Sequence, residues 1–371
     1  MSTSAQRPKL GHSNSYADAP FLSLGLMSGT SLDGIDVATV ESDGAAQVTN
    51  GPALTIPYPD DFRDRLRAVL GGVGEVAAIE EELTRLHAAA VAEFRARHPQ
   101  TRVELIGFHG HTILHEPENR RTWQIGDGAL LAKLSRCDVV ADFRSADVAA
   151  GGEGAPLAPL YHAALAAMLP KPLAVLNLGG VGNVTWVGDD GAILAFDTGP
   201  GNAMLDDWVR RYTGQPADLG GAIARSGRVF APHVTNFLAA GYFARKPPKS
   251  LDRDAFTAFV PHGQSPEDGA ATLTEMTAAA VAAAQTHFPR PAREFLVTGG
   301  GRHNPTLMAA LARLLGVPVR PVEAVGWDGD ALEAQAFAYL AIRSRRGLPL
   351  SLPTTTGAPH PMRGGRLFSA G

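Results

Sequence analysis

The stretch Gly25-Leu-Met-Ser-Gly-Thr-Ser-Leu-Asp-Gly-Ile-Asp36 decides how the beginning of this chain folds. An apolar run from Phe21 to Leu26 enters it and a second from Ile35 to Val40 leaves it, which predicts two strands joined by a glycine turn. Small and hydroxyl-bearing residues let backbone N–H groups approach an anion, so the turn is typical of a phosphate cradle. It is not a Walker A loop, because no Gly-Lys-Ser/Thr follows it and no helix opens directly after it.

Two carboxylates in this stretch, Asp33 and Asp36, would repel a bare phosphate. They make chemical sense if a divalent cation or an ordered water shell lies between them and the phosphate. We therefore interpret the hairpin as the phosphate-binding part of a nucleotide site.

The composition leaves room for two domains. The chain has 371 residues, of which 45% are hydrophobic and 19% charged, so a sizeable core can form. A net charge of −4 without a long basic run argues against nucleic acid as a partner. The single cysteine, Cys137, excludes an intramolecular disulfide and a cysteine zinc cluster, and it fits a cytoplasmic location.

No segment approaches the run of about 20 apolar residues that a membrane span needs, so we expect no membrane partner. Residues 1–19 are polar and lack a signal-peptide core, and we expect them to form a flexible tail. The sequence leaves the oligomeric state open, with a homodimer as one alternative.

Apolar β-like runs alternate with helix-like runs along the chain, which indicates an α/β fold. The helices predicted after the first hairpin are Asp60–Leu70, Ala78–His98, Pro156–Met168, Ala203–Tyr212, Thr272–His287, Pro305–Leu315 and Ala331–Arg345. The strands predicted there are Val103–Phe108, Val139–Ala141, Leu173–Leu178, Val184–Val187, Ile193–Phe196 and Glu294–Val297.

One internal similarity bears on the domain organisation. Leu24–Val40 and Leu173–Val187 both read as strand, glycine turn with Ser, Thr or Asn, and strand. This favours two similar domains that each offer a phosphate-facing hairpin to a shared cleft, and the alternative is two unrelated hairpins. We place the junction at Pro170-Lys-Pro172, with domain I at 20–170, completed by 340–371, and domain II at 171–339.

A second polar motif, Phe196-Asp-Thr-Gly-Pro-Gly-Asn202, ends a predicted strand and precedes a helix that Asn202 is expected to cap. A carboxylate at a strand end between flexible residues can face a cleft. Asp197 then suits a general base toward a hydroxyl or water, or a metal ligand through water. The alternative is an aspartate that accepts hydrogen bonds from its own turn.

The motif Thr298-Gly-Gly-Gly-Arg-His-Asn304 is another strand-to-helix turn, with Asn304 as N-cap and Pro305 at the first helical position. Its glycines permit close approach of a flat ring or a phosphate, so they are candidates for the nucleoside end of the site. The alternative is a tight connection without a ligand.

Three histidines lie close together in Phe108-His-Gly-His-Thr-Ile-Leu-His115. In an extended segment His109, His111 and His115 share one face, but Gly110 and the lack of a Cys or Glu ligand pattern argue against a metal. Hydrogen bonding to a polar substrate fits better, as does a structural role for at least one of the three.

The segment from Asp142 to Leu157 combines Arg144, Asp147 and Glu153 with three glycines. Such a loop suits a polyhydroxy or carboxylated ligand, since Arg144 can hold a carboxylate with two hydrogen bonds. The alternative is a solvated loop with a weak surface ion pair.

The last predicted helix opens with Asp330 and Glu333, at the spacing of a capping box. That arrangement accounts for Glu333 without any ligand.

Taken in order, these motifs resemble those of the anhydro-N-acetylmuramic acid kinase family, within the sugar kinase, Hsp70 and actin superfamily. The resemblance extends from about residue 22 to about residue 368. It rests on Gly25–Asp36, His109–Thr112, Gln124–Gly126, Val140–Arg144, Gly151–Leu157, Asn177–Asn183, Phe196–Asn202, Gly299–Gly301 and Glu333–Ala338.

The resemblance implies an α/β fold of two actin-like (ribonuclease H-like) domains with ATP in the cleft between them. It implies a cytoplasmic enzyme of peptidoglycan recycling that opens the internal ether of 1,6-anhydro-N-acetylmuramic acid, an amino sugar, and phosphorylates O6. The products would be N-acetylmuramic acid 6-phosphate and ADP. Asp197 would take a proton from the water that attacks C1, and the released O6 would then attack the γ-phosphate.

The resemblance also assigns residues to each ligand. Those for ATP are Gly29, Thr30, Ser31, Leu32, Asp33, Gly34, Ile35, Asp36, Gly179, Gly180, Asn183, Gly299, Gly300 and Gly301. Asp33 and Asp36 would also hold Mg²⁺, directly or through water. Those for the sugar are His109, His111, Thr112, Arg144, Asp147 and Glu333.

The chain departs from the usual family pattern at its expected sugar contacts. His111 stands where the family usually has Gln, and Glu153 stands where it usually has Gln. A Leu-Asp pair follows Ser250 where Thr-Gly is usual. Two other classes compete with a sugar kinase: an actin-like ATPase that drives domain closure, and a sugar-binding protein that has lost activity. The presence of Asp33, Asp36 and Asp197 argues against the latter.

Overall fold

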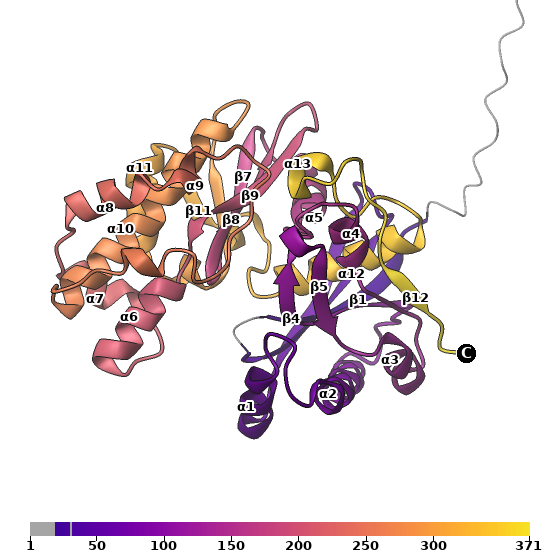
Figure 1. Ribbon diagram of the computed structural model, residues 1–371. Coiled ribbons are helices and arrows are strands. Elements are labelled where there is room, and N and C mark those ends of the chain that lie inside the picture. The colour runs from indigo at the N-terminus through magenta and orange to yellow at the C-terminus, as the bar shows by residue number, and fades with distance from the viewer. Residues whose placement is uncertain (1–18, 30–31) are drawn as a thin grey trace, which may run out of the picture.

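Two lobes, each built on one β-sheet with helices on both faces, make up the computed structural model (Figure 1). The structure describes residues 19–29 and 32–371. Apart from Ala19, the expected N-terminal tail therefore lies outside the described residues. Thr30 and Ser31 of the first hairpin also lie outside them.

The first lobe contains a sheet in the order β12-β6-β4-β1-β2-β3, with β5 paired to β4. Its strands are β1 (Phe21–Ser28), β2 (Gly34–Ser42), β3 (Val48–Pro57), β4 (Leu105–Glu116), β5 (Arg121–Ile125), β6 (Val139–Ala141) and β12 (Arg366–Phe368). Its helices are α1 (Asp60–Ala68), α2 (Val76–Arg97), α3 (Gly128–Ser135), α4 (Ser145–Ala149), α12 (Leu332–Arg345) and α13 (Pro353–Thr356).

The second lobe contains a sheet in the order β11-β10-β7-β8-β9. Its strands are β7 (Leu173–Leu178), β8 (Val181–Val187), β9 (Ile193–Pro200), β10 (Phe295–Thr298) and β11 (Val319–Pro321). Its helices are α6 (Ala203–Thr213), α7 (Ala222–Ser226), α8 (Ala231–Leu238), α9 (Gly241–Ala244), α10 (Pro266–Ala284) and α11 (Pro305–Leu315). Helix α5 (Pro159–Leu165) precedes this sheet in the chain.

The two sheets share one topology. In the first, β1, β2 and β3 form an antiparallel meander, and β4 and then β6 add in parallel beside β1. In the second, β7, β8 and β9 form the meander, and β10 and then β11 add in parallel beside β7. The strand orders β6-β4-β1-β2-β3 and β11-β10-β7-β8-β9 therefore correspond. This repetition confirms the predicted pair of similar domains.

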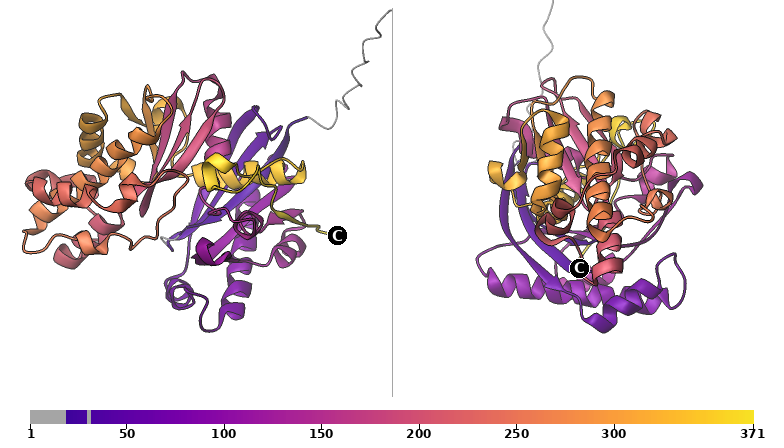
Figure 2. Two further views of the ribbon diagram at one scale, coloured as in Figure 1. Left: turned by 45° about the horizontal axis from the view of Figure 1, so that its top comes forward. Right: turned by 90° about the vertical axis from the view of Figure 1, so that its left-hand side faces the viewer.

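Helix α12 lies between the two sheets (Figure 2). Its Leu332 and Tyr339 share one apolar cluster with Val40 of the first sheet and Val175 of the second. Close packing of α12 on the first sheet requires glycine at position 107, because a Cβ there would lie 2.1 Å from the Phe337 carbonyl oxygen. The helix therefore packs closely on the first sheet and contributes to the apolar cluster that joins the lobes.

The predicted strands and helices are confirmed in type, and their ends differ where local chemistry was overlooked. Strand β4 continues to Glu116 because Gly110 adopts a φ of 72° and β5 pairs with the continuation. Helix α10 begins at Pro266, ahead of the predicted Thr272, because the Ser265 side chain caps it by accepting from the Asp268 amide at 3.1 Å. The predicted domain boundaries stay a prediction.

Two predicted caps have different outcomes. Asn304 caps α11 as expected, since its side chain accepts from the Leu307 amide at 3.0 Å. The side-chain cap predicted for Asn202 is wrong: Nδ2 donates to the Leu178 carbonyl at 2.7 Å instead. Asn202 thus joins the start of α6 to the end of β7.

Candidate active site

A row of polar residues crosses the end of the second sheet. Thr298 of β10 is paired with Asn177 of β7, Asn177 with Asn183 of β8, and Asn183 with Asp197 of β9. Residues directly opposite each other in a sheet share one face. On β7 the preceding residues of this face, Leu173 and Val175, belong to the apolar cluster that includes α12. The polar row therefore faces the first lobe.

The row is joined to the first lobe by Glu333. The Asn177 side chain donates to Glu333 Oε1 at 3.0 Å. Glu333 keeps solvent access, and partial desolvation by the neighbouring protein raises its pKa. The positive charge of Arg144 opposes that rise. Glu333 thus lies in the cleft between the lobes.

The predicted capping box of α12 is wrong. The N-cap is Ala331, and Asp328, not Asp330, accepts from the Asp330 and Ala331 amides at 3.0 and 3.2 Å. Asp330 instead forms an ion pair with Arg302 at 2.8 Å. The local account of Glu333 therefore fails, and its contact across the lobes takes its place.

Asp197 is held in a fixed orientation by one segment of the second lobe. Its Oδ2 accepts from the Leu251 amide at 2.8 Å, and its own amide donates to the Lys249 carbonyl at 3.0 Å. Burial raises the pKa of the Asp197 carboxyl to about 7, the Leu251 hydrogen bond opposes the rise, and the charge of Glu153 adds to it. Asp197 accepts from a segment distant in the sequence, and not from its own turn.

Three glycine turns gather at the same end of the second sheet. Gly201 donates to the Gly180 carbonyl at 3.0 Å, which ties the turn of the β7–β8 hairpin to the turn after Asp197. A Cβ on Gly299 would lie 2.4 Å from Asn177 Oδ1, and one on Gly301 would lie 2.6 Å from Leu178 Cβ. Gly179, Gly180, Gly299, Gly300 and Gly301 therefore surround the end of β7.

Asp36 of the first hairpin lies on the cleft side of its sheet. It is paired with Met27 across β1 and β2, and its Oδ1 accepts from Thr55 at 2.6 Å. Burial raises its pKa to about 6 against the effect of Thr55, and the charges of Asp33, Glu333 and Asp330 add to the rise. Carboxylates of the first hairpin and of the segment that begins α12 thus lie close enough to affect one another.

The rest of this hairpin is tightly folded. Leu32 is buried with a φ of 58°, and its amide donates to the Gly29 carbonyl at 3.1 Å. Gly34 and Ile35 are buried and begin β2 directly after the exposed Asp33. Since Thr30 and Ser31 lie outside the described residues, their predicted contact with phosphate stays a prediction.

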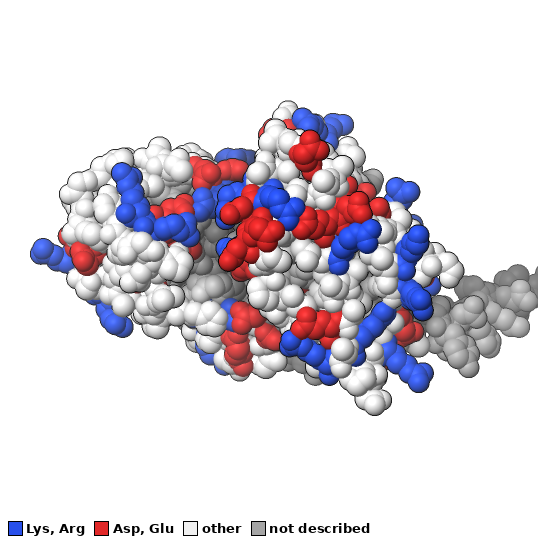
Figure 3. All heavy atoms as spheres, turned by 90° about the horizontal axis from the view of Figure 1, so that it is seen from below, with Lys and Arg blue, Asp and Glu red and all other residues white. Residues whose placement is uncertain are grey.

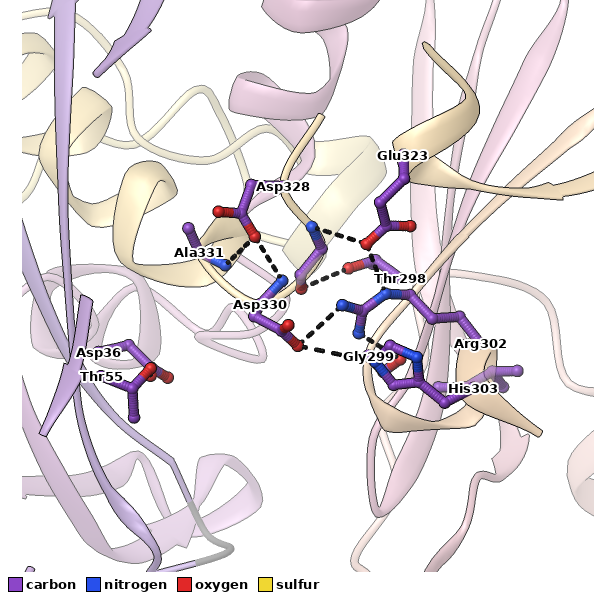
Figure 4. A network of polar contacts seen from close by, with 12 residues as sticks. Asp36, Thr55, Thr298, Gly299, Arg302, His303, Glu323, Asp328, Asp330 and Ala331 are labelled. Atoms are coloured by element: carbon purple, nitrogen blue, oxygen red, sulfur yellow. Dashed lines mark hydrogen bonds and ion pairs between the residues drawn. The ribbon is translucent and has the colours of Figure 1, made fainter. Parts of the chain in front are cut away.

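A polar network joins the Gly299–Gly301 turn to the start of α12 (Figure 4). The buried Arg302 donates to Glu323 at 2.8 Å and to the Gly299 carbonyl at 3.1 Å, and it pairs with Asp330. Thr298 donates to the Gly329 carbonyl at 3.1 Å. Figure 4 shows Asp36 beside Thr55 on the first sheet, apart from this network. Figure 3 shows a hollow between the lobes with acidic side chains at its rim.

Both predicted ligand histidines are buried and engaged with protein. His109 Nδ1 lies 2.9 Å from the Gly110 carbonyl, and Arg144 Nε donates to His109 Nε2 at 3.1 Å. His111 Nδ1 lies 2.9 Å from Ser28 Oγ, which also accepts from Tyr58. Burial lowers the pKa of both imidazoles, that of His111 to about 4, so both are neutral at pH 7.

These contacts bear on the interpretations of the histidine segment. No group of three or more His, Cys, Asp or Glu side chains suited to a metal occurs in the described part of the chain. His111 is fully buried and contacts Ser28 at the end of β1, which fits a structural role, while its Nε2 has no hydrogen-bond partner among the described residues and its predicted sugar contact stays a prediction. The half-buried Thr112, which accepts from Gln124 at 3.2 Å, remains a candidate.

Arg144 and Asp147 have different environments. Burial lowers the pKa of Arg144 to about 10, and the charges of Glu333 and Asp147 oppose that fall. Arg144 donates to the Gly154 carbonyl at 2.7 Å and remains partly accessible. Asp147 is buried and accepts from Gly154, Ser351 and Thr356. Its predicted sugar contact is unsupported, because these protein donors occupy the carboxylate.

Several residues that shape the site were not among the predicted ones. Asn177 joins the polar row to Glu333. The segment from Lys249 to Leu251 orients Asp197. Tyr242 donates its hydroxyl to the backbone carbonyl of Asp197 at 2.5 Å. Asn177 could have been found, because it continues the alternation of Leu173 and Val175 with a polar side chain. The Lys249–Leu251 contact could not, since more than fifty residues separate it from Asp197.

The comparison with known proteins agrees with this geometry. A family model described as anhydro-N-acetylmuramic acid kinase matches residues 21–370. The chain belongs to the anhydro-N-acetylmuramic acid kinase family. It is therefore a kinase, and its two sheets of corresponding strand order give the two-lobed α/β architecture that the resemblance implied.

Close relatives extend over nearly the whole of this kinase. The anhydro-N-acetylmuramic acid kinase of Paramagnetospirillum magneticum is 61% identical over 350 residues, 93% of this chain and 99% of the relative. Those of Acidiphilium cryptum and Rhodospirillum rubrum are each 55% identical, over 94% and 95% of this chain and 98% and 96% of the relatives. Within the described residues of the kinase, none of the helices has the length and apolar character of a membrane span.

Proposed function

We propose that this kinase uses ATP to open the 1,6-anhydro ring of 1,6-anhydro-N-acetylmuramic acid and to phosphorylate O6. The products are N-acetylmuramic acid 6-phosphate and ADP, and the reaction serves peptidoglycan recycling in the cytoplasm. The observation that carries the proposal is Asp197, whose carboxylate belongs to the row that faces the first lobe and has a pKa of about 7. A base with a pKa near the working pH is well matched to proton removal from water.

Asp197 supports the hydrolytic step. Its carboxylate accepts a proton from water while the water oxygen bonds to C1, and the C1–O6 bond breaks. The Leu251 amide fixes one carboxylate oxygen, which leaves the other for the water. O6, now free of C1, then attacks the γ-phosphate, and ADP leaves. Fixed geometry in a cleft with little water supplies much of the rate of such a reaction.

The glycine turns around the end of β7 suit the nucleotide. In this proposal Gly179 and Gly180 contact the phosphates, and Gly299, Gly300 and Gly301 contact the nucleoside. Backbone at such turns approaches a ligand closely because no Cβ intervenes. The first lobe offers its β1–β2 hairpin to the nucleotide in this proposal, and the second lobe offers Asn183, which is paired with Asn177 in the polar row.

Asp33 and Asp36 fit Mg²⁺. Both offer carboxylate oxygens, the ligands that this ion prefers. Burial raises the pKa of Asp36 most, and the negative charges of Asp33, Glu333 and Asp330 add to the rise; a divalent cation would neutralise these charges. When bound, Mg²⁺ offsets the charge of the β- and γ-phosphates.

Arg144, Glu333 and Thr112 are the residues we assign to the sugar. Arg144 offers a cation for the lactyl carboxylate, and Glu333 and Thr112 offer oxygens for hydroxyl and amide groups. His109 acts indirectly in this proposal, since it orients Arg144 through the 3.1 Å contact.

The test is sugar-dependent ADP release by the purified protein, followed by mass spectrometry of the product. The expected product is heavier than the anhydro sugar by one water and one phosphoryl group. A product that gains only the phosphoryl group contradicts the ring opening. ADP release that the sugar does not stimulate contradicts the kinase assignment to this substrate and favours an actin-like ATPase.

A further inference from the structure

Glu153 of the first lobe reaches across to the second lobe. It lies between α4 and α5, where its amide donates to the Thr356 carbonyl at 2.6 Å. Its Oε2 accepts from the Ser250 hydroxyl at 2.5 Å, and 97 positions of sequence separate the two residues. Both side chains are half-buried. A hydrogen bond from a hydroxyl to a carboxylate is among the stronger ones in proteins.

Ser250 is the middle residue of the segment that orients Asp197. On one side of it, the Lys249 carbonyl accepts from the Asp197 amide at 3.0 Å. On the other, the Leu251 amide donates to Asp197 Oδ2 at 2.8 Å. A displacement of Ser250 therefore moves both groups that fix Asp197.

The charged and titratable groups around Asp197 come from few elements. Glu153 contributes a negative charge from the first lobe, and Tyr242 at α9 donates its hydroxyl to the Asp197 carbonyl. Lys249 directs its ammonium elsewhere, to the Tyr242 carbonyl at 3.1 Å and to the face of the Tyr242 ring at 4.4 Å. Arg245 and His287 face Lys249 and not Asp197. Glu153 is thus the carboxylate that acts on Asp197.

We propose that Glu153 is a positioning residue, which holds the Lys249–Leu251 segment from the opposite lobe and so orients Asp197, and whose negative charge acts on that carboxylate. This inference rests on the proposed function of Asp197 as a base. Because the contact joins the two lobes, it forms only when they are arranged as they are here. Glu153 therefore couples the relative position of the lobes to the orientation of the base.

Glu153→Gln separates charge from hydrogen bonding, since the amide oxygen still accepts from Ser250. We expect this variant to shift the acidic limb of the kcat/KM profile for the anhydro sugar to lower pH, by about half a unit or more, because a like charge is removed. Ser250→Ala keeps the charge and removes the bond. We expect it to lower kcat by about 10-fold to about 100-fold with a smaller effect on KM, as misplacement of a reacting group does.

The matched control is Glu93→Gln, which removes an exposed carboxylate on α2 that pairs with Arg97. Its profile should coincide with that of the wild type. An acidic limb unchanged in Glu153→Gln overturns the action of the charge, and a kcat unchanged in Ser250→Ala overturns the positioning role. Circular dichroism and thermal melting identify any variant that fails to fold, and Glu153→Gln, nearly isosteric, is the variant expected to fold.

A second readout keeps this inference separate from the proposed reaction. Carboxyl ¹³C chemical shifts titrate Asp197 directly, with Asp197→Asn for assignment. A lower pKa in Glu153→Gln supports the action of the charge even if the wild type shows no sugar-dependent ADP release. An unchanged titration overturns it even if the kinase reaction is confirmed.

Discussion

Asn177 and Glu333 are joined by a 3.0 Å hydrogen bond that connects the two lobes at the centre of the site. Asn177 belongs to the polar row that ends at Asp197, and Glu333 lies in the first turn of the helix between the sheets. The contact brings a carboxylate from α12 to the polar row of the second sheet, where the proposed function has both substrates react. Each prediction below follows from a contact of this cleft or of the sheets beside it.

Asp197→Asn should lower sugar-dependent turnover by at least about 10²-fold, the lower end of what a general base contributes. The amide keeps the Leu251 hydrogen bond but cannot accept a proton from water. The measurement is ADP release at saturating ATP and sugar. Asp189→Asn, at an exposed ion pair with Arg290, is the control and should remain fully active. Near-normal turnover of Asp197→Asn removes this residue from its role.

The pH dependence of kcat/KM should rise through about pH 7, the pKa of the Asp197 carboxyl. Only the deprotonated carboxylate accepts a proton, so the rate should fall about tenfold for each pH unit below that value. The measurement is ADP release at low sugar concentration, over a pH range of about 5 to 9 that brackets the expected pKa. A profile flat across neutral pH contradicts the raised pKa.

The same raised pKa predicts a change in stability. Folding raises the pKa of Asp197 from 3.8 to about 7, so the native state binds the proton more tightly than the unfolded state. The corresponding stability is fully present below about pH 4 and is lost as pH rises toward about 7. Asp197→Asn, which never ionises, should therefore melt about 2 °C or more above the wild type at pH 8. This difference should shrink as the pH is lowered toward 4, and an equal difference at both pH values excludes the linkage.

Glu333→Gln should weaken sugar binding while sparing the fold. The amide oxygen still accepts from Asn177, but the negative charge that faces Arg144 is gone. We expect KM for the sugar to rise about tenfold, the loss expected for one charge-assisted hydrogen bond. Steady-state kinetics with varied sugar measures it. Glu323→Gln, outside the proposed sugar contacts, should leave this KM unchanged; an equal rise in both variants argues against a sugar contact of Glu333.

Gly107→Ala should destabilise the protein by about 2 kcal/mol or more, because its Cβ would lie 2.1 Å from the Phe337 carbonyl oxygen and would push α12 from the sheet. Gly241→Ala is the matched control, since a Cβ there meets nothing within 4 Å. The measurement is the free energy of unfolding in urea. Equal stability of the two variants would contradict direct packing of α12 on β4.

The sequence predicted the elements of this fold well, and physical reasons explain where it failed. Strands and helices follow from local periodicity, so β7 and β6 begin and end at their predicted residues. The capping box at Asp330 had the right spacing and still did not form, because Arg302 pairs with Asp330 and Asp328 caps the backbone instead. A local pattern cannot report a competing partner that comes from another element.

The predicted site residues also differ in whether partners from distant elements contact them. The charge of Glu333 acts on Asp36, and Asp197 shares a polar row with Asn177, which donates to Glu333; their roles toward ligands stay predictions. His111 and Asp147 come from equally prominent motifs, but Ser351 and Thr356 from a distant segment donate to the Asp147 carboxylate, and Ser28 contacts Nδ1 of His111. Whether a polar side chain faces a ligand or the protein depends on these neighbours.

The sequence by itself determined the repeated strand–turn–strand units, the alternation of helices and strands, and the carboxylates available for chemistry, since these depend on residue type and spacing along the chain. Only the tertiary structure decided that Asn177 meets Glu333, that Ser250 meets Glu153, and that the pKa of Asp197 lies near neutrality. The physical reason is that hydrogen bonds, burial and charge act over a few ångströms in space, and the groups concerned are brought within that range only when the two sheets pack against α12.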